Sequence, residues 1–190
     1  MNDEEVAARL DEVAGSSAYE VNLSDALSAW GNGGSLEPTR AECLAQIFGY
    51  SLSGVDEVER READGGPFGA TYSAGNAQWP PPTSNLPEDC LAYAARVVEF
   101  ANDPMVVARI SDLLWTLRYG ETPHKHAEEA VAAYLRFPSR GASHLPSFTN
   151  VQMAARALEI SIQLNNRELR EACREVLSSV SKDSLEEDDP

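Results

Sequence analysis

Residues 103–137, DPMVVARISDLLWTLRYGETPHKHAEEAVAAYLRF, predict two helices joined by a turn. Asp103 can cap the first helix, Pro104 suits its first position, and Gly120 stands where the chain can leave the helix in a left-handed conformation. The Thr-Pro pair at 122–123 repeats the cap-and-proline signal and opens the second helix. We take this pair as the centre of the fold and read the rest of the chain outward from it.

The first helix of the pair is apolar on two sides. Its valines, isoleucine and leucines share one broad arc, whereas Ala108 and Trp115 lie on another side. A helix of this kind is normally enclosed by neighbouring elements. Arg109 and Asp112 stand three residues apart on the remaining polar stripe, so we expect a structural ion pair there in preference to a binding or catalytic site.

Helical periodicity with end signals recurs outside this pair. At the start of one such helix, Thr39 and Glu42 are placed as a capping box. The sequence therefore predicts an all-α fold of stacked antiparallel helical hairpins, a repeat-like bundle, and the Ala-Ala-Arg triplets at 94–96 and 154–156 hint at repeated pairs. The further helices are expected at residues 2–14, 24–30, 40–50, 87–102, 150–164 and 167–180.

Three regions are expected along the chain. Residues 1–35 form a helical appendage, residues 36–181 form the main helical domain, and residues 182–190, KDSLEEDDP, have the composition of a disordered acidic tail. Inside the domain, residues 53–86 lack helical periodicity and form one long irregular loop. Loops of this length are uncommon in compact domains and are usually functional or disordered.

The chain is strongly acidic. Its 190 residues carry a formal net charge of −16, of which −12 falls on residues 1–100, whereas residues 101–182 sum to +1. Such a charge repels nucleic-acid backbones and anionic membrane surfaces, so neither is an expected partner. The first residues, MNDEEVAARL, are not a secretion signal, and no apolar run could span a bilayer, so we expect a soluble cytoplasmic protein.

Cysteine and histidine spacing predicts neither a disulfide nor a metal site. Cys43, Cys90 and Cys173 stand far apart with no Cys-x-x-Cys motif, and we interpret all three as buried free thiols. His124 and His126 are two residues apart near a helix start and do not face each other. The sequence therefore predicts no metal and no cofactor.

Catalytic motifs do not stand out either. There is no Gly-x-Ser-x-Gly elbow, and the glycine-rich run DGGPFGATYSAG at 64–75 lacks the lysine of a phosphate-binding loop. We expect no catalytic residue and no enzymatic activity.

A family resemblance rests on VVARISDLLW at 106–115, on AEEAVAAYL at 127–135, and on the upstream order of YSL, PFG and PPPTSNLPED. With these segments, the chain from about residue 24 to 166 resembles the N-terminal helical domain of uncharacterised bacterial proteins that carry a domain of unknown function. The shared heart, Ala-Arg-x-x-Asp-x-x-Trp, is here Ala108, Arg109, Asp112 and Trp115. The resemblance implies an all-helical, repeat-like domain that usually precedes a longer C-terminal region, and some relatives look like parts of defence-associated proteins. It implies no catalytic residues.

These observations favour a non-catalytic helical module that binds an unidentified protein partner. The resemblance suggests that this module belongs to a bacterial defence system. Phe68, Tyr72 and Trp79 in the irregular loop are the candidate interaction residues, because aromatic side chains anchor interfaces and loops on rigid scaffolds carry function. The alternative for these aromatics is packing against the helices. Two other functions stay open: an enzyme whose site is assembled only in three dimensions around Arg109, Asp112 and the glycine-rich run, and an acidic decoy that imitates nucleic acid.

Overall fold

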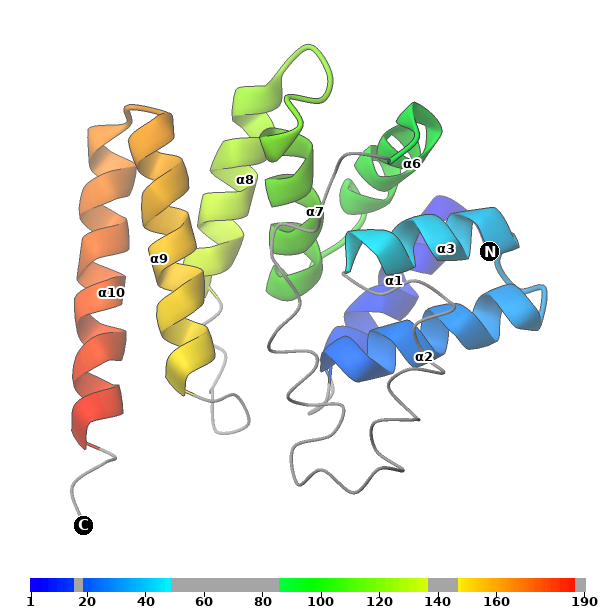
Figure 1. Ribbon diagram of the computed structural model, residues 1–190, viewed down its shortest axis with the longest axis horizontal. Helices are drawn as coiled ribbons and strands as arrows, with labels where there is room; N and C mark the ends of the chain where they lie inside the picture. The colour runs from blue at the N-terminus through cyan, green and yellow to red at the C-terminus, as the bar shows by residue number, and fades with distance from the viewer. Residues whose placement is uncertain (16–18, 49–85, 137–146, 187–190) are drawn as a thin grey trace.

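The computed structural model describes residues 1–15, 19–48, 86–136 and 147–186, and this part of the chain folds into helices without a strand (Figure 1). The all-α prediction is therefore confirmed. Residues 53–85 of the predicted irregular loop lie outside the described residues. The helices are α1 (Asp3–Ala14), α2 (Tyr19–Asn32), α3 (Pro38–Ile47), α6 (Glu88–Val98), α7 (Pro104–Thr116), α8 (Pro123–Arg136), α9 (Ser147–Gln163) and α10 (Arg167–Glu186).

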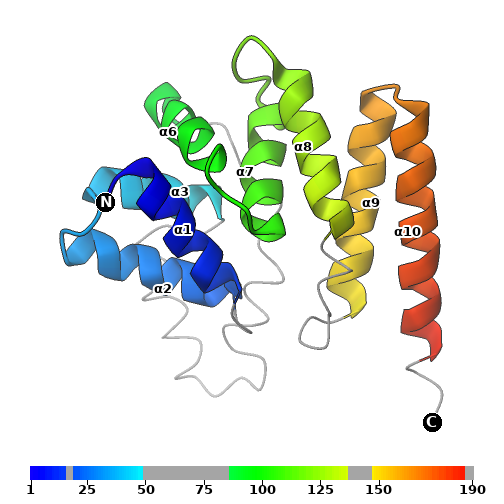
Figure 2. The same cartoon turned by 180° about the vertical axis from the view of Figure 1, so that it is seen from behind.

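Helix α7 lies at the centre of the arrangement. On one side of it, α8, α9 and α10 lie side by side in chain order, each packed on the one before it (Figure 1). On its other side lie α6, α1 and α3, and α2 packs against α1 and α3. The view from behind shows α1 in front of this second group (Figure 2). Helix α7 is thus enclosed by neighbours, as its two apolar sides predict.

Local end signals explain where several helices begin. The Asp103 carboxylate accepts a hydrogen bond from the Met105 backbone N–H at 2.9 Å, and Pro104 follows as the first residue of α7, as predicted. Helix α3 begins at Pro38 without a side-chain cap. The predicted capping box of Thr39 and Glu42 is therefore wrong, because the fixed φ of the proline suits the first helical position and the helix begins two residues before the expected residue 40.

Other helix ends differ from the prediction. Helix α2 begins at Tyr19, before the expected residue 24, and α6 ends at Val98. Helix α10 continues to Glu186, six residues past the expected end and into the segment predicted to be a disordered tail. Lysine, leucine and glutamate in that segment are good helix formers, so the acidic run does not stop the helix. Residues 187–190 lie outside the described part of the chain.

The end of α7 uses a left-handed residue other than glycine. Gly120 has a positive φ of 78°, as predicted, but the helix has already closed at Arg118, whose φ is 54°. The Tyr119 N–H bonds to the Leu114 carbonyl at 2.9 Å, and the Arg118 N–H bonds to the Trp115 carbonyl at 3.0 Å. These two bonds form a Schellman closure, in which glycine is the usual left-handed residue.

Helix α9 ends in the same way. Asn165 has a φ of 52°, and its N–H bonds to the Ile162 carbonyl at 3.0 Å, while the Asn166 N–H bonds to the Ser161 carbonyl at 3.2 Å. Asparagine tolerates this conformation better than most side chains. Both α7 and α9 therefore turn back into the next helix through one kind of closure.

One apolar core runs through the described residues. Val6 and Leu10 of α1 and Leu23 and Leu27 of α2 are fully buried, and they belong to the same cluster as the core residues of α3 and α6–α9 and Cys173 of α10. The helices of the predicted appendage, residues 1–35, thus share this core. Of the helices described, none combines the length and the apolar content needed to cross a membrane.

A single carboxylate ties α1 to the chain that enters α7. Asp11 accepts the backbone N–H of Asn102 at 2.8 Å on one oxygen and the backbone N–H of Asp103 at 2.9 Å on the other. Backbone N–H groups before a helix have no partner within the helix, so the two bonds satisfy groups that would otherwise need water.

The cysteine prediction needs a correction. Cys43 of α3 and Cys90 of α6 form a disulfide, with Cα atoms 5.4 Å apart, so these residues are not free thiols. Their 47-residue separation gave no signal, because the pairing depends on α3 and α6 meeting in space. Cys173 is a buried free thiol, as predicted, and burial raises its pKa.

Candidate functional site

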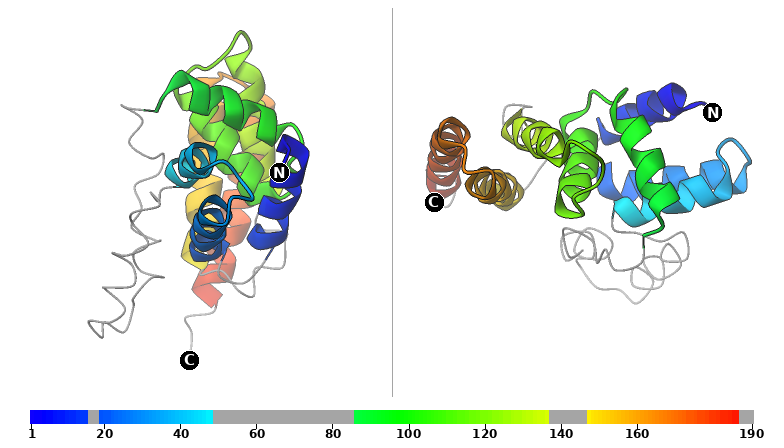
Figure 3. Two further views of the ribbon diagram at one scale, coloured as in Figure 1. Left: turned by 90° about the vertical axis from the view of Figure 1, so that its right-hand side faces the viewer. Right: turned by 90° about the horizontal axis from the view of Figure 1, so that it is seen from above.

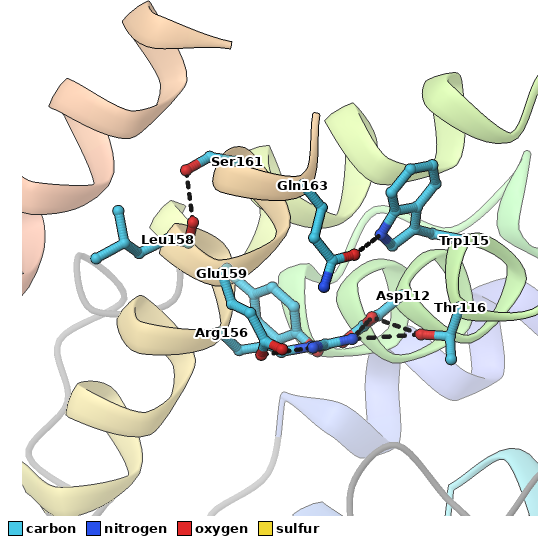
Figure 4. A network of polar contacts seen from close by, with 9 residues as sticks. Asp112, Trp115, Thr116, Arg156, Leu158, Glu159, Ser161 and Gln163 are labelled. Carbon is cyan, nitrogen blue, oxygen red and sulfur yellow. Dashed lines mark hydrogen bonds and ion pairs between the residues drawn. The ribbon is translucent and has the colours of Figure 1, made fainter. Parts of the chain in front are cut away.

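The most extensive polar network in the described residues centres on Asp112 of α7, whose side chain is fully buried (Figure 4). One carboxylate oxygen, Oδ2, accepts bonds from Tyr134 Oη of α8 at 2.7 Å and from Arg156 Nε of α9 at 2.9 Å. The other oxygen, Oδ1, accepts a bond from Arg156 Nη2 at 2.8 Å. Side chains from three helices thus meet at one carboxylate. Arg156 binds it through two parallel hydrogen bonds, and this bidentate geometry is the strong one for an arginine and a carboxylate.

Arg156 extends the network toward the surface. Its Nη1 donates to Glu159 Oε2 at 2.6 Å, and its Nη2 also lies 3.3 Å from Thr116 Oγ1, which itself bonds to Asp112. Burial lowers the pKa of the guanidinium, but the bonds and charges of Asp112 and Glu159 outweigh it and raise that pKa. The arginine therefore stays charged, and its charge is balanced by the buried carboxylate of Asp112 and the exposed carboxylate of Glu159.

Trp115 lies next to this network and joins the same three helices. Its indole N–H donates to Gln163 Oε1 of α9 at 3.3 Å, and the ring meets the His124 ring of α8 edge-on with centroids 5.5 Å apart. The guanidinium of Arg118 stacks over the ring, with its carbon 3.2 Å from the centroid. The left-handed backbone at Arg118 is thus compensated by a contact between a cation and an aromatic face.

The geometry of Asp112 defines what it can do chemically. Both oxygens are buried and already accept hydrogen bonds from Tyr134 and Arg156, so the carboxylate does not face a space that a substrate could enter. Within the part of the chain that the structure describes, no three His, Cys, Asp or Glu side chains lie together in a way that could hold a metal ion. The arrangement suits the alignment of α7, α8 and α9.

The structure describes two of the predicted site residues, and the other three lie outside the described part of the chain. Arg109 and Asp112 are both buried on α7, and Asp112 is indeed ion-paired, but its ion-pair partner is Arg156 of α9. The pair between Arg109 and Asp112 stays a prediction. The candidate interaction residues of the loop lie outside the described residues; these are Phe68, Tyr72 and Trp79.

Sequence reasoning missed Tyr134 and Arg156. Tyr134 lies among the apolar residues of AEEAVAAYL at 127–135, and nothing local marks its hydroxyl as a donor to Asp112. Arg156 follows Ala154 and Ala155 in one of the two Ala-Ala-Arg triplets, and that triplet was the only local signal near it.

A second polar cluster surrounds Tyr93 of α6. The guanidinium carbons of Arg40 from α3 and Arg96 from α6 lie 5.1 and 5.6 Å from its ring centroid, and both arginines also pair with Asp3 of α1. The Tyr93 hydroxyl is buried without a hydrogen-bond partner among the described residues. Burial, with a contribution from Asp3, raises the pKa of Tyr93 to about 12.

Removing the hydroxyl group from these two tyrosines should have opposite effects. Tyr134→Phe loses a bond to a charged acceptor, so we expect the free energy of unfolding to fall by about 1.5–3 kcal/mol. Tyr93→Phe removes a buried hydroxyl that has no partner, so we expect no loss and a gain of up to about 1 kcal/mol. Urea unfolding of both variants beside the parent measures the difference. Equal losses would show that Asp112 gains nothing special from Tyr134.

The fold and its polar network define the described part of the chain as a helical bundle whose central helix is aligned by a buried ion pair. The chain belongs to the family described as Domain of unknown function (DUF7380), which matches residues 16–172. The match includes the predicted heart from Ala108 to Trp115, so the resemblance to a domain-of-unknown-function family is confirmed at that level. No curated protein and no solved structure matches the chain.

Proposed function

We propose that the protein is a non-catalytic, repeat-like helical module that binds another protein. The supporting observation is the row formed by α7, α8, α9 and α10, in which each helix packs mainly on its neighbours in the chain (Figure 3). Helices that stack one after another in this way form the extended surfaces by which helical-repeat proteins bind partners. Bacterial origin and a role in defence stay predictions.

Two details support the repeat-like interpretation. Helices α7 and α9 both end in a Schellman closure and turn into the following helix. The two Ala-Ala-Arg triplets also use their arginines in a similar way. Arg96 Nε lies 2.8 Å from Asp3 Oδ2 of α1, and Arg156 Nε lies 2.9 Å from Asp112 Oδ2 of α7. In each case the arginine ties its helix to a carboxylate of another helix.

The Asp112 network favours a binding module over the enzyme alternative. An enzyme centred on α7 would need reactive groups with open access, whereas Asp112 is fully buried and bound by Tyr134 and Arg156. The decoy alternative draws on the net charge of −16, but residues 101–182, which supply α7–α9 and most of α10, sum to +1. A decoy would need the negative charge displayed on the folded helices.

The proposed location is the cytoplasm. The Cys43–Cys90 disulfide limits the form in which the protein could exist in that compartment. Disulfides persist in oxidising compartments and are rare in the cytosol, where those that form are usually transient or redox-sensing. A cytoplasmic protein with the Cys43–Cys90 bridge would therefore have a redox-dependent state.

The interaction proposal is tested by replacing Trp79, one of the three candidate aromatic residues. We expect Trp79→Ala to melt like the parent and to lose a partner that the tagged parent recovers from a lysate of the source cells. Phe100→Ala is the matched control, because Phe100 is also a large apolar residue and is 45% exposed. This control should keep both the melting temperature and the partner.

The alternative role of Trp79 predicts a different result. If its side chain packs against the helices, Trp79→Ala should lose about 3–5 kcal/mol of stability and still bind. That outcome would exclude Trp79 as an anchor of the interface. A true partner should be recovered by the parent and by the Phe100→Ala control. If the parent recovers no such protein, the support for an interaction module is removed.

A further inference from the structure

The Cys43–Cys90 disulfide is asymmetric in its exposure. Cys43 on α3 is partly exposed, whereas Cys90 in the first turn of α6 is 6% exposed. The third cysteine, Cys173 on α10, is a fully buried free thiol. A small molecule in solution therefore reaches one cysteine of the bridge more readily than the other two cysteines.

We propose that the Cys43–Cys90 bridge is a reversible redox site, opened by a low-molecular-weight thiol such as glutathione that attacks the sulfur of Cys43. Exchange of this kind requires a thiolate to approach one sulfur of the disulfide, and its rate depends on access to that sulfur. The greater exposure of Cys43 makes it the sulfur attacked, and Cys90 is then the leaving group. This proposal is independent of the interaction function.

The exchange proceeds in two balanced steps. The small thiolate forms a bond to Cys43 Sγ, the bond between the two protein sulfurs breaks, and its electron pair stays on Cys90 Sγ, which takes up a proton. A second small thiolate then attacks the small-molecule sulfur of the mixed disulfide, the bond from that sulfur to Cys43 Sγ breaks, and Cys43 Sγ keeps the electron pair and takes up a proton. The products are two protein thiols and one small-molecule disulfide. The protein disulfide is reduced by two electrons and the two small thiols are oxidised. The reverse reaction uses the small-molecule disulfide as the oxidant.

The leaving sulfur lies in a mixed electrostatic environment. Cys90 is the third residue of α6, and the free backbone N–H groups of a first helical turn favour a negative charge. Glu88 and Asp89 in the same turn oppose that charge. The proposal that Cys43 is the sulfur attacked therefore rests on the exposure of Cys43 and not on the environment of Cys90.

Re-closure is favoured because α3 and α6 are also held together without the bridge. Asp3 of α1 pairs with Arg96 of α6 at 2.8 Å and with Arg40 of α3 at 3.9 Å, and Arg40 also stacks on the Tyr93 ring of α6. Cys43 lies three residues after Arg40, and Cys90 lies three residues before Tyr93. Residues three apart share a helix face, so the polar cluster keeps the two sulfurs facing each other after reduction. A reaction between groups held this way benefits from a high effective concentration.

The test places the full chain in glutathione buffers of stepped oxidation ratio, followed by acid quenching and mass spectrometry. We expect three species: the bridged protein, a mixed disulfide carried on Cys43, and the reduced protein, with Cys173 unmodified throughout. Reduction should lower the melting temperature by about 10 °C, because the bridge closes a long loop, and oxidation should restore it. Hydrogen exchange should increase in α3 and α6 and change little in α9 and α10.

Three variants complete the test. Cys43→Ser and Cys90→Ser should each melt like the reduced parent and show no further response to reductant, whereas Cys173→Ser should keep the full response. If the serine variants do not fold, the reduced parent supplies the same comparison. A mixed disulfide found mainly on Cys90, a melting temperature unchanged by reduction, or a reduced chain that does not re-form the bridge would each overturn the proposal.

Discussion

The Asp112→Asn variant should lose about 3–5 kcal/mol of the free energy of unfolding. Asparagine has nearly the same shape as aspartate, so the change removes the charge without opening a cavity. Arg156 would then keep a guanidinium whose side chain is 17% exposed and whose two parallel bonds to the carboxylate are gone. Glu159 would still pair with Arg156, but its side chain is 58% exposed and replaces the buried partner only in part. A charge inside a protein that loses its buried partner is far more costly than the intact pair is stabilising.

Two further variants make this result specific. Glu159→Gln removes the other carboxylate of the network, but that side chain is 58% exposed, and we expect a loss of less than about 1 kcal/mol. Adding Arg156→Met to Asp112→Asn removes the guanidinium that has lost its buried partner, so the double variant should recover part of the lost stability. Urea unfolding at neutral pH measures all three. Similar losses for Asp112→Asn and Glu159→Gln would show that the buried bond does not align α9.

Trp115→Ala should cost about 3–5 kcal/mol, because it removes a large buried side chain from the junction of three helices. The indole is 3% exposed and contacts Arg118, His124 and Gln163. A cavity at this position removes packing between α7 and both α8 and α9. Thermal unfolding, followed by circular dichroism, gives the shift, and urea unfolding gives the energy.

Trp115→Phe separates the ring from its hydrogen bond. Phenylalanine keeps an aromatic face for Arg118 but has no N–H for Gln163, so we expect a loss of about 1–2 kcal/mol, well below that of alanine. If Trp115→Ala loses no more stability than Trp115→Phe, the neighbouring residues have filled the space of the missing side chain. The ring would then not be what holds the three helices together.

The parts of the fold that were predictable depend on local signals. Asp103 and Pro104 mark the start of α7, and Pro123 marks the start of α8, because capping and the fixed proline φ act within one turn of helix. Apolar periodicity then places the buried faces. These signals need no knowledge of the neighbouring helices, so a single sequence is enough to reveal them.

The candidate site could not be predicted, because its contacts join residues that are far apart in the sequence. Asp112 was singled out on its polar stripe, but its partners on other helices are 22 residues away at Tyr134 and 44 residues away at Arg156. Nothing near Asp112 in the sequence distinguishes these donors from the neighbouring Arg109. Cys43 and Cys90 pose the same problem, since only the meeting of α3 and α6 makes them a pair.

The end of α7 shows how tertiary contacts can override a local preference. Gly120 was the expected left-handed position from the sequence, yet Arg118 already adopts this conformation. The left-handed region costs an L-residue roughly 1–2 kcal/mol, and the stacking of Arg118 on Trp115 offsets part of that cost. Because that stacking depends on where the indole lies, the position of the turn is set by packing as well as by glycine.

The disulfide between α3 and α6 makes the backbone from Cys43 to Cys90 a closed covalent ring. If a protease cuts one peptide bond within this ring, the two pieces remain linked through the sulfurs. The piece that carries α1 and α2 would then stay attached to the piece that carries α7 to α10, and the two would separate on a gel only after reduction. For this chain, a single band on a non-reducing gel is therefore not a measure of an intact backbone.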